Sequence, residues 1–292
     1  MEKGAEELST WPTGLIEVAP ATYSYVQAVG SAGISNAGLI LGPDQVLVVD
    51  ALATIPMAVK FLGHIRCVTP HPISHILLTH PHMDHFLGIQ TLLPAQIVSH
   101  ALCREEMIKI GPDAADQWAK RRPQFAEGLK GVRVCLPEQT FKDRVTFFLG
   151  EMEVQFFHLG YGHTRGDGLV YLPNEKVLFA GDVAFFKVTP QGFHGHLGNW
   201  INIVNRILDM DIETIVPGHG PIGGKVDLLE MRTYLELVYD QARQCFRQGM
   251  SESESVAKID IGPYHTWVEQ ERIKDNVERA YQEFRGEVTL IE

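Results

Sequence analysis

The sequence lacks the features that mark secreted, membrane-spanning and disulfide-bonded proteins. Its four cysteines lie far apart and form no C-x-x-C pair, which argues against a disulfide framework and a zinc knuckle. No run approaches the roughly 18 apolar residues of a membrane span. The acidic stretch from Met1 to Thr10 has no signal-peptide pattern. No G-x-S-x-G nucleophile elbow is present either. We therefore expect a cytoplasmic protein with reduced thiols.

Basic residues are also in short supply. The 25 lysines and arginines are outnumbered by 36 acidic residues, which gives a formal net charge of -11 spread along the chain. Nucleic acid or an anionic membrane would require a basic face, so neither is the expected partner. The apolar fraction of 45% and charged fraction of 21% are typical of a globular protein with a substantial core. A small-molecule substrate is the expected partner.

The densest group of chemically active side chains is the stretch Thr-His-Pro-His-Met-Asp-His, which directly follows an apolar run. It places four potential metal ligands within six residues: His80, His82, Asp84 and His85. His80 and His82, two apart in extended backbone, can aim at one point, and Asp84 and His85 at a second point nearby. Imidazole and carboxylate ligands suit zinc, with iron and manganese as alternatives.

Apolar periodicity predicts alternating strands and helices along the chain. Strands are expected at 46–50, 75–79, 97–99, 132–134 and 214–216, with a hairpin formed by 169–172 and 177–180, and helices at 55–65, 199–210, 225–248, 252–258 and 266–284. This order indicates two sheets packed face to face with helices outside. We expect an N-terminal arm over 1–14, a catalytic domain over 15–224 and a helical extension over 225–292 packed on it.

Three more polar residues share one context, because each is flanked by glycine at the end of an apolar strand. They are His163, Asp182 and His219. Glycine lets backbone and ligand approach a crowded centre, and a strand gives each ligand a rigid base. Asp50 also ends an apolar strand, where its carboxylate either braces the metal loop or caps the following helix.

The motif His80-x-His82-x-Asp84-His85, followed in order by His163, Asp182 and His219, resembles that of the metallo-β-lactamase-fold hydrolase superfamily over about residues 15–224. The resemblance implies an α/β fold, an αββα sandwich of two mixed sheets with outer helices. By motif, one metal would be bound by His80, His82 and His163. The second would be bound by Asp84, His85 and His219, with Asp182 bridging both. The bridging aspartate is similar to the glyoxalase II-like and lactonase-like branch, whereas typical β-lactamases lack it.

The resemblance further implies a hydrolase that holds two Zn²⁺ ions and uses a metal-bridged hydroxide to cleave a thioester, a lactone or a related carboxylic ester. Asp84 would hold the proton of the hydroxide. One alternative is an iron-dependent oxidoreductase resembling persulfide dioxygenases. Another is a promiscuous β-lactam or phosphotriester hydrolase on the same fold, and a third is a non-catalytic binding protein. Presence of all seven ligands favours the dinuclear hydrolase.

The substrate pocket is less clearly indicated by the sequence. Aromatic and histidine side chains follow the predicted bridging aspartate or precede a ligand, and they are candidate substrate contacts: Tyr161, Phe185, Phe186, Phe193, His194 and His196. They would form a wall for an apolar acyl group, although core packing explains some of them equally well. No basic cluster of the kind that binds glutathione is apparent. A homodimer is the expected oligomeric state.

Overall fold

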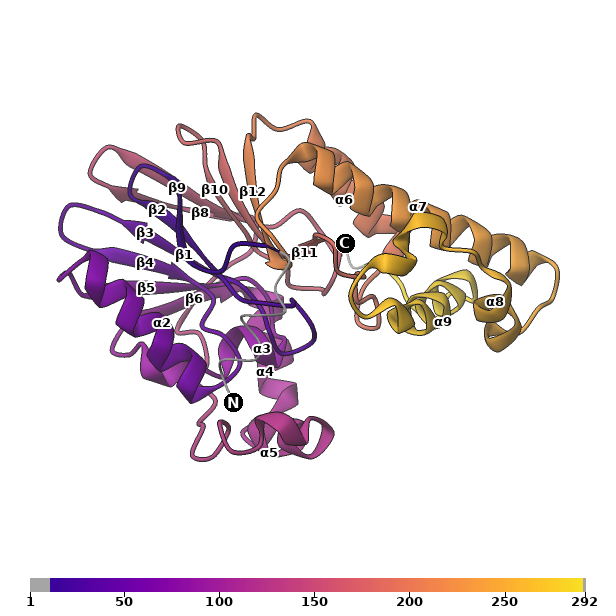
Figure 1. The fold of residues 1–292 in the computed structure, drawn as a ribbon, viewed down its shortest axis with the longest axis horizontal. Helices are drawn as coiled ribbons and strands as arrows, with labels where there is room; N and C mark the ends of the chain where they lie inside the picture. The colour runs from indigo at the N-terminus through magenta and orange to yellow at the C-terminus, as the bar shows by residue number, and fades with distance from the viewer. Residues whose placement is uncertain (1–10, 291–292) are drawn as a thin grey trace.

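The computed structural model describes residues 11–290, in which two mixed β-sheets face each other and helices cover both outer faces (Figure 1). The predicted αββα sandwich is therefore confirmed. Of the arm expected over 1–14, residues 1–10 lie outside the described residues. No helix within 11–290 is both long enough and apolar enough to cross a membrane.

The first sheet has seven strands in sequential order, antiparallel from β1 to β4 and parallel from β4 to β7. Because parallel strands end at the same edge of a sheet, the segments that follow β4 and β5 lie close together. The strands are β1 Gly14–Ala19, β2 Thr22–Val26, β3 Ala37–Leu41, β4 Val46–Val49, β5 Ile73–Leu78, β6 Gln96–His100 and β7 Gln139–Phe141.

The second sheet has five strands in the order β12-β11-β10-β9-β8, and only β11 and β12 run parallel. The predicted hairpin is present as β10 and β11, but β11 continues well past the expected end. The strands are β8 Arg144–Leu149, β9 Met152–Phe157, β10 Leu169–Leu172, β11 Val177–Phe185 and β12 Thr214–His219. The strand expected at 132–134 is wrong, because these residues are irregular.

Alternation of side chains along the strands divides the interior into three apolar clusters. The middle one fills the space between the sheets and includes Leu77, Phe156 and Phe179. A second lies under helices on the outer face of the first sheet, and a third under helices on the outer face of the second. The helices of the first face are α2 Ile55–Val68, α3 Met83–Phe86, α4 Ala101–Ile110 and α5 Ala114–Arg121.

The C-terminal helices belong to the third cluster. α7 packs against α6, β11 and α9, and Tyr234 and Trp267 share one core with Phe185 and Trp200 (Figure 1). These helices are α6 Leu197–Leu208, α7 Lys225–Arg247, α8 Glu252–Lys258 and α9 Ile273–Phe284, with 3-10 turns at Gly262–Thr266 and Gln270–Arg272 between the last two. The extension thus lies beside the edge at which β11 and β12 end.

Candidate metal centre

The loop that follows β5 carries the first four candidate ligands. β5 ends at Leu78, and the chain turns through His80 and His82 into the short helix α3, which contains Asp84 and His85. His80 and His85 are almost completely buried. The other two are partly exposed. The end of β5 therefore gives the loop a rigid base, and the ligands lie at the edge of the sheet where its parallel strands end.

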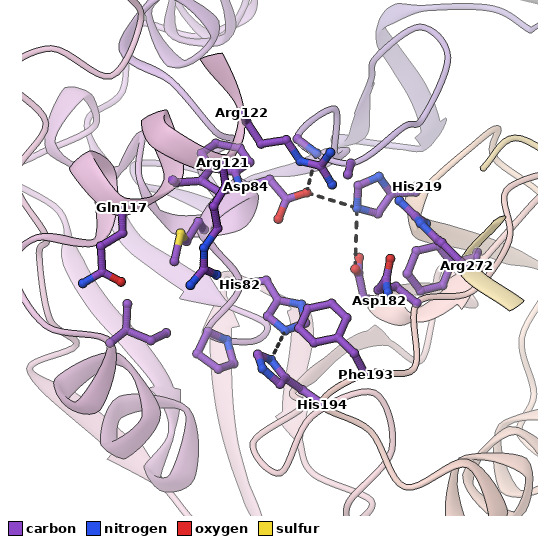
Figure 2. Close-up of a pocket in the computed structure, with 18 of the residues that line it drawn as sticks. His82, Asp84, Gln117, Arg121, Arg122, Asp182, Phe193, His194, His219 and Arg272 are labelled. Carbon is purple, nitrogen blue, oxygen red and sulfur yellow. Dashed lines mark hydrogen bonds and ion pairs between the residues drawn. The ribbon is translucent and has the colours of Figure 1, made fainter. Parts of the chain in front are cut away.

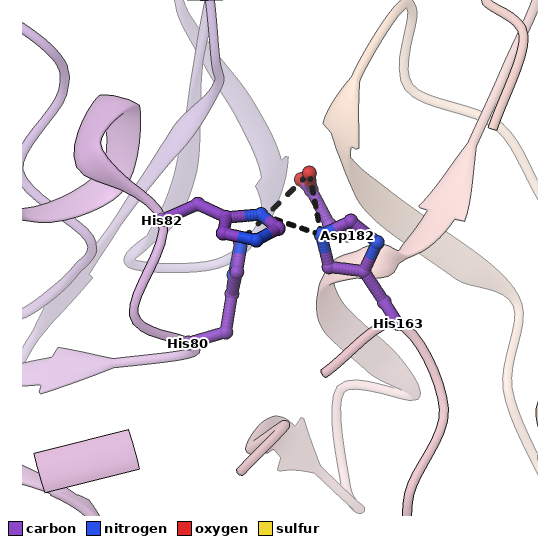
Figure 3. A group of neighbouring side chains, drawn as sticks. All are labelled: His80, His82, His163 and Asp182. Atoms are coloured by element: carbon purple, nitrogen blue, oxygen red, sulfur yellow. Dashed lines mark hydrogen bonds and ion pairs between the residues drawn. The ribbon is translucent and has the colours of Figure 1, made fainter. Parts of the chain in front are cut away.

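Three ligands come from the second sheet. His163 lies on the loop after β9, Asp182 lies within β11, and His219 is the last residue of the parallel strand β12. The structure brings them together with the four residues of the first loop in two groups whose ligand atoms lie within 4.8 Å of one another. One group is His80, His82, His163 and Asp182 (Figure 3), and the other is Asp84, His85 and His219.

Asp182 lies between the two groups. Its Oδ2 is 3.3 Å from Nε2 of His163 and 3.5 Å from Nε2 of His219, while its Oδ1 is 3.1 Å from Nε2 of His85. A single carboxylate therefore faces imidazoles of both groups. This is the geometry that a bridging ligand of a dinuclear metal site requires, and the two groups are consistent with such a site.

Hydrogen bonds to Nδ1 fix the tautomer of three histidines. Nδ1 of His80 is 3.0 Å from the hydroxyl of Thr79, which itself donates to Asp50. Nδ1 of His85 donates to Asp50 Oδ2 at 2.8 Å, and Nδ1 of His219 donates to the carbonyl of Gly30 at 3.0 Å. In each ring Nε2 faces Asp182, where it can serve as a metal ligand once it carries no proton.

Asp50 braces the metal loop and does not cap the next helix. Its Oδ1 accepts a hydrogen bond from the backbone N–H of Thr79 at 2.8 Å, and its Oδ2 accepts from Thr79 Oγ1 at 2.7 Å and from His85. The N-cap of α2 is instead Thr54. Of the two sequence interpretations of Asp50, the structure supports the bracing role.

Burial and charge set the protonation of the ligands. Burial lowers the pKa of His80, His82 and His163, that of His163 to about 4. Burial also opposes the charged form of His219, but the nearby carboxylate of Asp182 outweighs it and raises the pKa to about 9. Burial would raise the pKa of Asp182 itself, yet the surrounding histidines hold it well below its usual range. An ionised carboxylate thus sits among imidazoles.

The donor set fits bound cations. Among the described residues, Nε2 of His80, Nε2 of His85 and Oδ1 of Asp182 are buried polar atoms without a well-formed hydrogen bond, although the last two lie 3.1 Å apart. Buried polar atoms are normally satisfied, so unsatisfied atoms that converge on one place point to an ion. Glycine keeps the space open, because a methyl group at Gly218 would lie 1.9 Å from Oδ1 of Asp182.

A cavity of about 370 Å³ opens beside the ligands (Figure 2). Three of the candidate substrate contacts line it. Phe185 is buried and stacks on His219 with ring centroids 5.3 Å apart, and Phe193 stacks on His82 at the same centroid distance. Nδ1 of His194 is 3.0 Å from Nε2 of His82.

The other three candidate contacts lie outside the cavity lining. Phe186 is buried in the core. The hydroxyl of Tyr161 accepts a hydrogen bond from Arg279, and Nδ1 of His196 accepts one from the backbone N–H of Asn199 at the start of α6. These side chains therefore support the walls of the site without facing the space beside the metal ligands.

Sequence reasoning missed the basic side chains of the cavity. Lys109, Arg121, Arg122 and Arg272 all line it, as do Gln117, Trp118 and Gln191. The four basic residues come from α4, the end of α5 and the 3-10 turn before α9, segments to which no motif drew attention. The run Lys120-Arg121-Arg122 in an otherwise acidic chain was the available signal.

The family model of the metallo-beta-lactamase superfamily matches residues 30–219, which include all seven ligand positions. The chain belongs to the metallo-beta-lactamase superfamily. Its fold and its two His/Asp ligand groups agree with that assignment.

Individual relatives are distant. A linear primary-alkylsulfatase from Pseudomonas sp. (strain ATCC 19151) is 22% identical over 85% of this chain and 55% of that protein. The acyl-coenzyme A thioesterase MBLAC2 from Gallus gallus is 23% identical over 65% of this chain and 73% of that protein. The structure of the sec-alkylsulfatase Pisa1 from Pseudomonas sp. superimposes with a TM-score of 0.73 at 18% identity, over 94% of this chain and 50% of that one. The chain spans about half the length of the alkylsulfatases that it matches.

Proposed function

We propose that the protein is a zinc-dependent hydrolase that uses a dinuclear site to cleave an ester-type bond of a small molecule. The observation that carries the proposal is the position of Asp182, whose two oxygens lie 3.1–3.7 Å from imidazole nitrogens of both ligand groups. Two bound divalent cations would supply an activated water near neutral pH and would polarise the carbonyl oxygen under attack.

The residues divide this work between them. His80, His82 and His163 would hold one cation, and Asp84, His85 and His219 the other, while Asp182 contacts both. Asp84 has a pKa well below its usual range, because the His219 and His85 side chains overcome the effect of burial. Its Oδ2 accepts a hydrogen bond from the backbone N–H of Gly33 at 3.0 Å, which leaves Oδ1 to accept a hydrogen bond from the attacking water and orient it.

The cavity wall favours a substrate with an apolar body. Its apolar lining comprises Met83, Ile110, Trp118, Phe185 and Phe193. Apolar side chains beside a metal site exclude bulk water and pack against an acyl or alkyl chain. We infer carboxylic ester-type bonds, thioesters and lactones as the leading substrates. The likeness to an acyl-coenzyme A thioesterase supports the thioester.

Hydrolysis of an alkyl sulfate ester is the second candidate. The likeness to alkylsulfatases covers 85% of the chain in sequence and 94% in structure, so it extends beyond the matched family region into the C-terminal helices. Those helices carry Arg272 to the cavity. This observation makes sulfate esters the class to test after the carboxylic esters.

The test is a panel assay on zinc-loaded protein with acyl thioesters, lactones, aryl esters, alkyl sulfates and β-lactams, alongside metal analysis. We expect about two zinc ions per chain and turnover of at least one ester class. His82→Ala should lose most of the metal and reduce turnover by more than about a thousandfold. His71→Ala, at an exposed histidine outside the site, is the matched control. Hydrolysis near the wild-type rate by His82→Ala, or one iron per chain with oxygen uptake, would refute the proposal.

A further inference from the structure

Two arginines of the cavity rim have no acidic partner within residues 11–290. Arg121 ends α5 and Arg122 follows it, both are exposed, and neither forms an ion pair or a hydrogen bond with any residue in the described range 11–290. Figure 2 shows Arg121 extending into the space between Gln117 and His82, and Arg122 extending toward Asp84 and His219. In a chain of net charge -11, unpaired cations beside the candidate metal centre need an explanation.

The other basic residues of the cavity differ in this respect. Lys109 pairs with Glu106 at 2.8 Å. Arg272 is almost completely buried, pairs with Glu269 and donates to the carbonyl of Thr189 at 2.8 Å. Their charges are largely balanced by groups of the protein itself. Arg121 and Arg122 are therefore the two cavity cations left to bind something outside the described chain.

Helix capping alone does not account for this arrangement. Cations in the last turn of a helix interact favourably with its dipole, which explains a basic end of α5. It does not explain which side chains turn toward the cavity. Lys120 stands in the same turn and is exposed, yet it does not line the cavity. Arg121 and Arg122 do, and Arg121 is close enough to His194 to contribute, after burial and Arg279, to lowering the pKa of that histidine.

We propose that Arg121 and Arg122 bind an anionic group of the substrate that is separate from the bond being cleaved; this deepens the proposed function and rests on it. A carboxylate, sulfate or phosphate at the far end of the substrate has the required chemistry. The planar guanidinium forms paired hydrogen bonds with such oxyanions. Phe193 and Trp118 then contact the apolar body that joins this group to the ester at the metal ligands.

The test compares two thioesters that share a leaving group, one with an acyl chain that ends in a carboxylate and one that ends in a carboxamide. Wild-type protein should prefer the carboxylate substrate by at least about tenfold in kcat/KM. Arg121→Gln/Arg122→Gln should remove this preference mainly through KM, leaving the carboxamide substrate within about threefold. The preference should also weaken as salt rises, because the rim is exposed. Lys120→Gln is the control and should behave as wild type.

The alternative is that the arginines bind the reacting group itself. Decyl sulfate tests this alternative, because its only anionic group is the sulfate ester that is cleaved. The proposal is overturned if the double variant slows decyl sulfate as strongly as the carboxylate thioester, since the arginines would then bind the reacting group. It is also overturned if both thioesters lose activity equally, or if wild-type protein shows no preference between them.

A binding experiment separates failure of this proposal from failure of the proposed function. If no ester is hydrolysed, decanoate and decanamide are titrated into the protein and binding is measured by calorimetry. The protein is first treated with a chelator, so that the carboxylate of decanoate cannot bind to metal. The proposal stands if wild-type protein and Lys120→Gln bind decanoate at least about tenfold more tightly than the double variant, with decanamide unchanged. Equal decanoate binding by all three proteins overturns it.

Discussion

The ligand groups and the cavity rim are built in opposite ways. Four of the five ligand histidines and Asp182 are at most 4% exposed, whereas Phe193 on the rim is 41% exposed and Arg121 and Arg122 are exposed too. His80, His85 and His219 lie at or just after strand ends, and their Nδ1 atoms are held by buried partners. The rim is assembled from α4, α5, the 189–196 loop and the turn before α9. The comparison suggests that the metal chemistry depends on the buried ligand groups, whereas substrate choice depends on the exposed rim of the cavity.

The largest effect should come from closing the space that the ligands occupy. A methyl group in Gly218→Ala would lie 1.9 Å from Asp182 Oδ1 and 2.8–2.9 Å from the backbone of residues 181 and 182, so Asp182 must move. We expect loss of most bound metal and at least about a thousandfold lower kcat. Metal analysis and steady-state kinetics measure both.

Gly63→Ala provides the matched control for that substitution. Gly63 is an exposed position in α2, and a methyl group there would meet no atom within 4 Å. Alanine in a helix interior is favoured over glycine, so this variant should be as active as wild type and more stable by about 0.5–1 kcal/mol. Full metal content in Gly218→Ala would show that the ligand groups are less rigid than the contrast with the rim requires.

A smaller effect is expected from the group behind the ligands. In Asp50→Asn, one acceptor oxygen becomes an N–H donor, so Thr79 and His85 can no longer both keep their hydrogen bonds to it. We expect metal affinity to fall about 10–100-fold, measured by competition with a chelator, while saturating metal restores most of the turnover. Asp44→Asn, in the exposed turn before β4, should leave metal affinity unchanged. If Asp50→Asn binds metal as tightly as wild type, the His80 to His85 loop keeps its conformation without Asp50.

The contrast also explains what the sequence could and could not predict. The ligand groups were predictable, because close spacing in the His80 to His85 loop and glycine-flanked strand ends leave local marks. The fold was predictable from strand and helix periodicity. The rim was not. Arg121 and Arg272 come from helical segments far apart in the chain, and only tertiary packing brings them to one cavity. The extension of β11 past Asp182 was also missed, since glycine within an apolar run indicates a strand end.

The smallest effect should come from loosening the rim loop. Three side chains of α9 hold this loop and the start of α6: Asn276 binds Gly192 and Pro190, Arg279 binds Gly195 and Tyr161, and Glu283 binds Leu197. Arg279→Gln removes the middle contact but touches no ligand. We expect KM for the best substrate to rise about three- to fivefold with kcat within about twofold, and the free energy of unfolding to fall by about 1–2 kcal/mol.

Lys274→Gln, exposed on the same helix, is the control and should change neither KM nor stability. Urea unfolding and metal analysis accompany the kinetics of both variants. Because Phe193 and His194 lie on the loop and contact His82, a loop that also positions metal would lose zinc in Arg279→Gln. If Arg279→Gln keeps its zinc but has a raised KM, the loop positions substrate and does not position the metal. Lost zinc would instead show that the boundary between the two regions runs through His194, so that the C-terminal helices support the metal chemistry as well as substrate choice.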